Sequence, residues 1–256
     1  MHAVELTSGH SMPLMGLGTW DLKGPHCTEV VGLALDLGYR QIDTAHMYQN
    51  QEAIGKALAQ SGVDRREIFL TTKIWKDALR HEQVLRQFQE CLELLGTPYV
   101  DLLLIHWPDA EVPLEETLGS FNALCDQGKV RSIGVSNFSS AQVDQAQAVS
   151  RAPVCVNQVL YHVGHNQEEL RRHHQDQKVV TTAYCPLARG KTATDQMLRQ
   201  IGQRHGKSAA QVALRWLVQK AVVVIPKASS KEHLSANQEI FDWELTSQEM
   251  AQLDRT

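Results

Sequence analysis

The sequence predicts a (β/α)8 barrel, the TIM-barrel architecture, and two observations carry that prediction. Short apolar runs rich in β-branched residues alternate with longer amphipathic segments along the whole chain of 256 residues. The alternation repeats eight times, so each unit averages 256/8 = 32 residues, which suits a barrel better than an open doubly wound sheet. Neither a low-complexity linker nor a block of charge interrupts the series, and we therefore expect residues 1–256 to form a single domain.

The near-continuous apolar strands indicate a parallel sheet that helices cover. Gly38, Gly62, Gly96 and Gly128 stand where helices should end, because glycine adopts the left-handed conformation of a helix C-terminus without strain. We expect strands at 14–18, 40–44, 68–73, 100–105, 130–135, 154–158, 178–183 and 221–225. We expect helices at 27–37, 50–60, 80–95, 114–127, 139–148, 166–175, 192–219, 231–239 and 246–253.

The segment before residue 14 precedes the repeating pattern. Gly9-His10 is a candidate turn between two short strands in this segment. We expect the resulting hairpin to close the bottom of the barrel.

The composition excludes several classes of protein. Hydrophobic residues at 43% and charged residues at 21% are typical of a globular chain with a sizeable core. The formal charge of 25 − 29 = −4 lacks the basic footprint of a nucleic-acid or anionic-membrane binder. Five scattered cysteines without a Cys-x-x-Cys pair predict neither disulfides nor a zinc ribbon. With no signal peptide or long apolar run, we expect a cytoplasmic protein that does not contact membranes.

Four residues with complementary chemistry lie at the ends of consecutive predicted strands. The second strand ends at Asp43 with Tyr48 five residues on, the third ends at Lys73 and His106 follows the fourth, and chemistry in barrels occurs at this carboxyl end. A Lys73 ammonium beside Asp43 stabilises both charges, and beside Tyr48 it lowers the pKa of the phenol from about 10. Such a phenol is a general acid, and His106 is placed to orient a carbonyl oxygen.

An acid of this kind needs a partner that creates the oxyanion. No catalytic Ser, Cys or carboxylate pair accompanies the four residues, so an external hydride donor is the simplest candidate. The alternatives are a structural ion pair of Asp43 with Lys73 and a metal-dependent barrel hydrolase or isomerase. Four histidines invite a metal site, but no carboxylate or Cys completes a recognised spacing. We interpret them as solvated helix and loop residues and expect no metal; they are His162, His165, His173 and His174.

Seven segments in order and spacing then carry a resemblance to the aldo-keto reductases. The likeness covers essentially the whole chain, and within the family it is closest in appearance to bacterial 2,5-diketo-D-gluconate reductase-like and methylglyoxal reductase-like members. The segments are GYRQIDTAHMYQNQEAIGKAL (38–58), IFLTTKIW (68–75), YVDLLLIHWP (99–108), GKVRSIGVSNF (128–138), NQVLYH (157–162), TAYCPLARG (182–190) and IPKASSKEHLSAN (225–237).

The resemblance implies a monomeric, NADPH-dependent oxidoreductase that reduces small aldehydes and ketones to alcohols. It implies that Asp43, Tyr48, Lys73 and His106 form the catalytic tetrad, with Tyr48 as proton donor. It also implies that Tyr184 stacks on the nicotinamide ring. The implied cofactor-binding residues are Thr19, Trp20, Asp43, Ser136, Asn137, Gln158, Tyr184, Pro186, Leu187, Lys227, Ser229, His233 and Asn237. The implied substrate pocket is formed by Trp20, Trp75, His106 and Trp107.

The sequence departs from the family pattern in the segment that binds the 2′-phosphate of NADP. His233 stands where an Arg is usual, and Ala228 stands where a Ser is usual. Histidine is a weaker and pH-dependent anion partner, so NADPH is the expected cofactor with NADH as an alternative. The loop 108–114 is short and the chain ends at Thr256, for which the resemblance implies an open pocket. A non-catalytic barrel that senses the cofactor is a further alternative.

Overall fold

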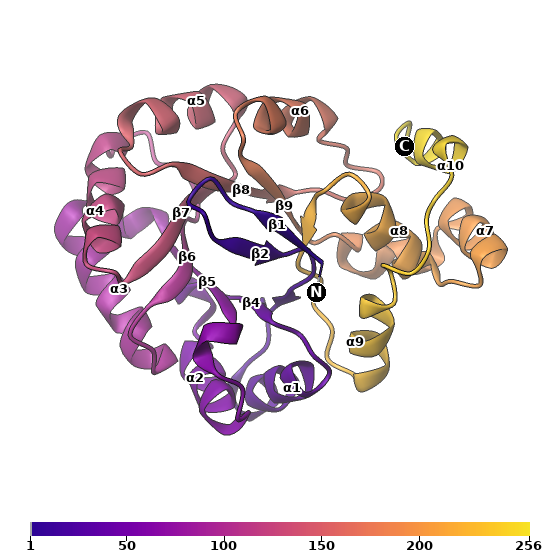
Figure 1. Cartoon of the computed structure of the whole chain (residues 1–256), viewed down its shortest axis with the longest axis horizontal. Helices are drawn as coiled ribbons and strands as arrows, with labels where there is room; N and C mark the ends of the chain where they lie inside the picture. Colours follow the sequence, from indigo (N-terminus) through magenta and orange to yellow (C-terminus); the bar gives the residue numbers. More distant parts are fainter. Residues whose placement is uncertain (1) are drawn as a thin grey trace.

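Eight parallel strands surround a common interior in the computed structural model, which describes residues 2–256. The ladder runs in chain order, and a parallel bridge between Met15 and Val224 joins its first and last strands. The predicted (β/α)8 barrel is thereby confirmed (Figure 1). The strands are β3 (Leu17–Gly18), β4 (Gln41–Asp43), β5 (Phe69–Ile74), β6 (Val100–Ile105), β7 (Val130–Ser136), β8 (Val154–Leu160), β9 (Val180–Tyr184) and β10 (Val223–Val224).

Helices form a ring around these strands, and α7 and α10 lie at its outer edge (Figure 1). Among residues 2–256, none of the helices combines the length and the apolar character that crossing a bilayer requires. The helices are α1 (Gly24–Asp36), α2 (Gln51–Gln60), α3 (His81–Leu95), α4 (Leu114–Asp126), α5 (Ser140–Val149), α6 (Glu168–Asp176), α7 (Gln196–His205), α8 (Ala209–Val218), α9 (Lys231–Gln238) and α10 (Ser247–Leu253). Short 3₁₀ helices are η1 (His46–Tyr48), η2 (Arg65–Glu67), η3 (Lys76–Ala78) and η4 (Ala188–Thr194).

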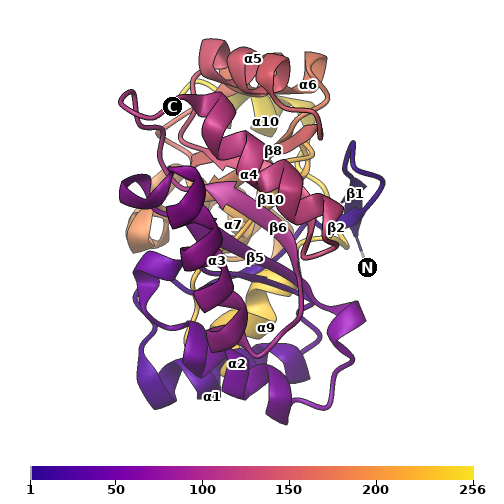
Figure 2. The ribbon, with the colours of Figure 1, turned by 90° about the vertical axis from the view of Figure 1, so that its left-hand side faces the viewer.

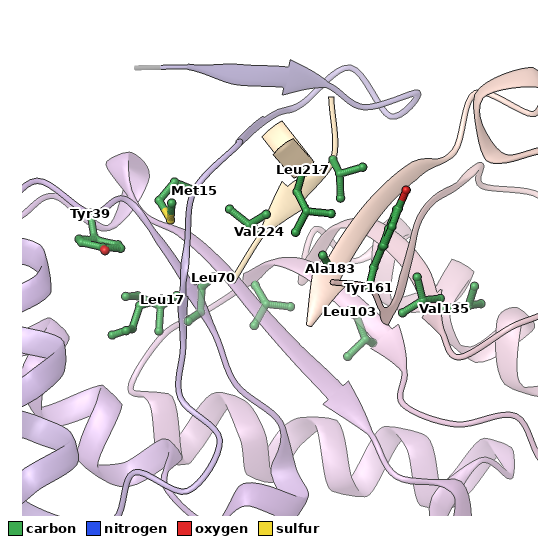
Figure 3. Packing of buried hydrophobic residues seen from close by; sticks show 14 of the residues in the cluster. Met15, Leu17, Tyr39, Leu70, Leu103, Val135, Tyr161, Ala183, Leu217 and Val224 are labelled. Atoms are coloured by element: carbon green, nitrogen blue, oxygen red, sulfur yellow. The ribbon is translucent and has the colours of Figure 1, made fainter. Parts of the chain in front are cut away.

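The main hydrophobic core lies between the strands and the helices. Side chains alternate along a strand, so one set faces the helices while the next faces the barrel interior. Leu70, Leu103 and Val135 belong to the outward set of three strands and are fully buried (Figure 3). Asp43, one residue after the outward Ile42 on β4, belongs to the inward set.

The expected N-terminal hairpin is present and closes the bottom of the barrel. Strand β1 (Ala3–Glu5) pairs antiparallel with β2 (Ser11–Pro13), and the pair lies across the centre of the ring (Figure 1) and at one end of the barrel (Figure 2). Leu6 and Met12 pack with inward-facing strand residues such as Leu102 and Val156. The connection is longer than the expected turn at Gly9-His10, because five residues separate Glu5 from its partner Ser11.

The helix expected at 192–219 is wrong as a single element. It divides into η4, α7 and α8, because Gly206 ends α7 in the left-handed conformation with φ 64°. Ser208 then starts α8 with a reciprocal capping box, in which its side chain accepts from the backbone N–H of Gln211 and the Gln211 side chain accepts from the backbone N–H of Ser208.

Candidate active site

The structure brings the four predicted catalytic residues together at the carboxyl end of the barrel. Asp43 ends β4, Lys73 lies in β5, and His106 directly follows β6. Tyr48 ends the 3₁₀ helix η1, which follows β4 and turns the phenol back toward the strands. The rings of Tyr48 and His106 lie edge to face, with centroids 5.6 Å apart.

Lys73 is fully buried and uses its ammonium on three oxygen atoms. It donates to Asp43 Oδ1 at 2.5 Å, to the Thr44 carbonyl at 2.9 Å and to Tyr48 Oη at 3.4 Å. Burial lowers the pKa of Lys73, but the Asp43 carboxylate and Tyr48 raise it by more, so the net direction is upward. The ammonium therefore stays charged, and its three hydrogens are all directed at these acceptors.

Tyr48 is the residue for which the expected pKa shift is wrong in direction. Burial raises the pKa of the phenol, and this outweighs the lowering by Lys73; Asp43 adds a further rise. The sequence indicated the Lys73 contribution but not the depth of burial. Because an ammonium can only donate, the Tyr48 oxygen accepts from Lys73 and the hydroxyl hydrogen is left for another acceptor.

His106 is held neutral beside Tyr48. Burial and the nearby Lys73 charge lower the pKa of its imidazole to about 3. Its ring also lies edge to face with Trp75, with centroids 4.9 Å apart. Within residues 2–256 the buried Nδ1 atom meets no hydrogen-bond partner. A neutral imidazole carries one N–H, so His106 can donate a hydrogen bond without adding charge.

A second polar group lies next to this tetrad. Gln158 donates to Asp43 Oδ2 at 2.8 Å, so the carboxylate is held from two sides. The Tyr184 hydroxyl donates to Asn137 Oδ1 at 2.9 Å, and Asn137 Nδ2 donates to the His106 carbonyl at 3.0 Å. Ser136 donates to the Gln158 carbonyl at 2.8 Å. These bonds fix the Tyr184 ring at the end of β9.

Aromatic side chains stand at the mouth of the barrel. Trp20 and Trp107 are the exposed large hydrophobic residues of the described chain, at 49% and 41% exposure. The Trp20 ring lies edge to face with Tyr48 at a centroid distance of 5.1 Å. Trp20 thus lies beside Tyr48 and Trp75 beside His106, whereas Trp107 stands exposed after His106 and pairs with no other aromatic ring among residues 2–256.

The remaining cofactor candidates differ in their accessibility. Thr19 is buried and donates to the Asp43 carbonyl at 2.9 Å. Asn237 is also buried, at 4% exposure. Pro186 is buried and Leu187 is partly exposed in the turn after β9. The exposed candidates are Lys227 and Ser229 in the β10–α9 loop and His233 in the first turn of α9.

Asn50 positions the loops around Tyr48, and the sequence did not single it out for this. Its amide donates to the Thr19 carbonyl at 2.9 Å and to the Leu22 carbonyl at 3.2 Å. Its amide oxygen accepts from Thr44 Oγ1 at 2.7 Å. A buried Asn before a helix usually suggests an N-cap, yet this amide joins the β3–α1 loop to the end of β4.

One of the four histidines considered as solvated is instead fully buried. His174 accepts from Asn157 Nδ2 at 2.9 Å and donates to Thr181 Oγ1 at 2.8 Å. Burial lowers the pKa of this imidazole to about 4. Across residues 2–256 there is no group of three His, Cys, Asp or Glu side chains placed to share a metal ion.

Known proteins resemble this chain in sequence over almost its whole length. A model of the Aldo/keto reductase family matches residues 14–256. The glyoxal reductase of Bacillus subtilis (strain 168) is 39% identical over 252 residues, which cover 98% of this chain and 91% of the relative.

Solved structures show the same relationship. A chain crystallised as a candidate 2,5-diketo-D-gluconic acid reductase B superposes with a TM-score of 0.96 at 41% identity, over 100% of this chain and 91% of the other. A mutant of Gox0644 in complex with NADPH gives a TM-score of 0.94 at 36% identity, over 99% and 93%.

Proposed function

This chain belongs to the aldo/keto reductase family, and we propose that it reduces small aldehydes, ketones or α-dicarbonyl compounds to alcohols with NADPH. One observation carries the proposal: Lys73 donates to the phenol oxygen of Tyr48 and leaves the hydroxyl hydrogen for a substrate. The similarity to a glyoxal reductase supports the α-dicarbonyl class.

The proton is the part of the reaction that this chain supplies. A reduced nicotinamide, when bound, supplies the hydride. We propose that His106 donates a hydrogen bond to the carbonyl oxygen and orients it toward Tyr48. Tyr48 gives its proton to that oxygen as negative charge develops there. The buried ammonium of Lys73 then stabilises the phenolate, and Asp43 keeps that ammonium charged.

The groups near Tyr184 fit a nicotinamide. A carboxamide needs both donors and acceptors, and Ser136, Asn137 and Gln158 offer hydroxyl and amide groups of both kinds. The Tyr184 ring presents a flat, half-buried face whose orientation its bond to Asn137 fixes. Its fixed ring supports stacking on the nicotinamide with little loss of side-chain entropy.

We assign the other parts of the cofactor to the turn after β9 and to the segment that runs from the β10–α9 loop into the first turn of α9. Pro186 and Leu187 line the pyrophosphate path, and Lys227 and Ser229 bind the adenosine 2′-phosphate, with His233 in the first turn of α9 beside them. Asn237 would contact the adenine edge only after its buried side chain becomes accessible.

The substrate pocket follows from the aromatic mouth. We propose that Trp20 and Trp75 wall the carbonyl substrate beside Tyr48 and His106, with Trp107 at the outer rim. A wall of aromatic rings favours small, partly apolar carbonyl compounds. We further propose that the protein acts as a monomer in the cytoplasm, where its unpaired cysteines stay reduced.

A steady-state assay tests the proposed function. The purified protein is mixed with NADPH and, in turn, with methylglyoxal, a simple aromatic aldehyde and a simple ketone. We expect loss of NADPH absorbance matched one to one by alcohol formation with at least one of these compounds. If NADPH is bound but never oxidised, the protein is a cofactor sensor and the proposal is wrong.

A further inference from the structure

Two loops meet at the rim of the barrel on opposite sides of the junction between β3 and β10. The β3–α1 loop carries Asp21, and the β10–α9 loop carries Lys227. Asp21 Oδ2 lies 3.6 Å from Lys227 Nζ, so the two side chains form an ion pair between the loops. Both side chains remain accessible, at 70% and 45% exposure.

The backbone holds the two loops at this separation. The Gly18 N–H donates to the Pro226 carbonyl at 3.2 Å. A Cβ atom on Gly18 would lie 2.4 Å from the Ile225 carbonyl oxygen, so only glycine allows so close an approach. The position of Asp21 opposite Lys227 is therefore a consequence of how the barrel closes.

The local backbone conformation at Asp21 is one that suits this residue type. Asp21 has a φ of 67°, in the left-handed region that Asp and Asn tolerate better than other residues with a side chain. The preceding residue, Trp20, is anchored by its ring contact with Tyr48. Asp21 thus places a negative charge at the rim of the same loop that walls the pocket.

We propose that Asp21 competes with the 2′-phosphate of NADPH for Lys227, and that Asp21 thereby shifts the preference between NADPH and NADH toward NADH. The inference rests on the proposed function, in which Lys227 binds that phosphate. A phosphate carrying nearly two negative charges must displace the carboxylate from the ammonium and then lie close to it. NADH lacks this group, so Asp21 weakens NADPH binding and leaves NADH binding unchanged.

The expected effect is modest because the pair is exposed. Exposed ion pairs contribute a few tenths to about 1 kcal/mol, which corresponds to roughly a 1.5- to 5-fold change in an equilibrium constant. We therefore expect Asp21→Asn to tighten NADPH binding about two- to fivefold. Asn keeps the shape and the left-handed tolerance of Asp, so the loop conformation is retained.

The experiment is a tryptophan-fluorescence titration of the full chain with NADPH and, separately, with NADH. Asp21→Asn is compared with wild type and with Asp36→Asn, which makes the same charge change at an exposed position near the other end of α1. The titration is repeated in a Lys227→Met background, where Asp21→Asn should no longer change NADPH binding. We expect Asp21→Asn to bind NADPH more tightly than wild type and NADH equally well, and Asp36→Asn to bind both as wild type does.

Different outcomes separate the two proposals. Wild type that binds neither dinucleotide would overturn the proposed function, and this inference with it. If wild type binds NADPH but Asp21→Asn changes NADPH and NADH binding equally, the inference is overturned and the proposed reductase function stands. The same follows if Asp21→Asn changes NADPH binding no more than Asp36→Asn does. The inference is also overturned if Asp21→Asn still tightens NADPH binding in the Lys227→Met background.

Discussion

The ammonium of Lys73 donates to the phenol oxygen of Tyr48 across 3.4 Å, and the same nitrogen lies 2.5 Å from the Asp43 carboxylate. The contact is directional, because an ammonium has no lone pair with which to accept the phenol hydrogen. It orients Tyr48 as a donor, while burial keeps the phenol protonated by raising its pKa. In the proposed reaction the ion pair and the phenol therefore act as one unit, which stabilises the developing negative charge and donates the proton.

Replacing Lys73 by Met should lower both the stability of the protein and its turnover. Asp43 is 2% exposed and would be left as an unpaired buried charge, which costs about 3–5 kcal/mol of unfolding free energy. We expect turnover to fall by at least about 100-fold, because the phenolate loses its counter-charge. Denaturant unfolding and steady-state kinetics measure the two effects.

The double variant Asp43→Asn/Lys73→Met separates the loss of stability from the loss of turnover. It removes both charges, so we expect most of the stability to return while turnover stays low. Recovery of turnover together with stability would mean that Lys73 acts only as a structural partner of Asp43.

Replacing Asn50 by Ala should loosen the loop that carries Trp20. The variant loses the bonds to Thr19, Leu22 and Thr44 and leaves buried groups unpaired, at a cost of about 1–3 kcal/mol. We expect KM for the carbonyl substrate to rise with kcat little changed, because Tyr48 itself is held by Lys73.

A matched control is available in Asn122, a buried Asn of α4 that accepts from Ser150 and Ala152 away from the site. Asn122→Ala should lose similar stability and keep a normal KM. Equal KM values in the two variants would argue against a positioning role for Asn50.

His174 should make stability depend on pH in the acidic range. Its folded pKa of about 4 lies below the ordinary value of 6.5 because the ring is buried. Between these two pH values the unfolded chain binds a proton on this imidazole and the folded chain does not. The stabilisation present above pH 6.5 is therefore lost as pH falls toward about 4. The full loss is on the order of 3 kcal/mol, at 1.36 kcal/mol per pKa unit.

Denaturant midpoints at neutral and mildly acidic pH test this for wild type and His174→Gln. We expect acidification to lower the denaturant midpoint less in His174→Gln than in wild type. In His26→Gln, whose side chain is exposed on α1, the midpoint should fall as much as in wild type. An unchanged loss in His174→Gln would assign the acid sensitivity to other groups.

The fold and the spatial grouping of Asp43, Tyr48, Lys73 and His106 could be predicted because both follow from strand order. Asp43 ends β4, Lys73 lies one residue before the end of β5 and His106 directly follows β6, and neighbouring parallel strands bring their carboxyl ends to one rim. Apolar periodicity is enough to count those strands. The hairpin at the bottom was also visible, since Gly9 punctuates a short segment before the first unit.

What the sequence could not supply was burial depth and pairing between distant segments. The pKa of Tyr48 rises because desolvation outweighs Lys73, and no local pattern measures desolvation. The Asp21–Lys227 pair joins two loops that meet only when the barrel closes. The break at Gly206 did carry a signal, since Gly precedes a Ser with Gln three residues later, a capping-box pattern.

The central claim is that Tyr48 donates the proton, and Tyr48→Phe tests it most directly. The variant keeps the ring that contacts Trp20 and His106 and removes only the hydroxyl. We expect NADPH to bind as in wild type by tryptophan fluorescence, and turnover to fall by about 100- to 10,000-fold. Turnover near the wild-type rate, with binding intact, would contradict the account and require another proton donor in this site.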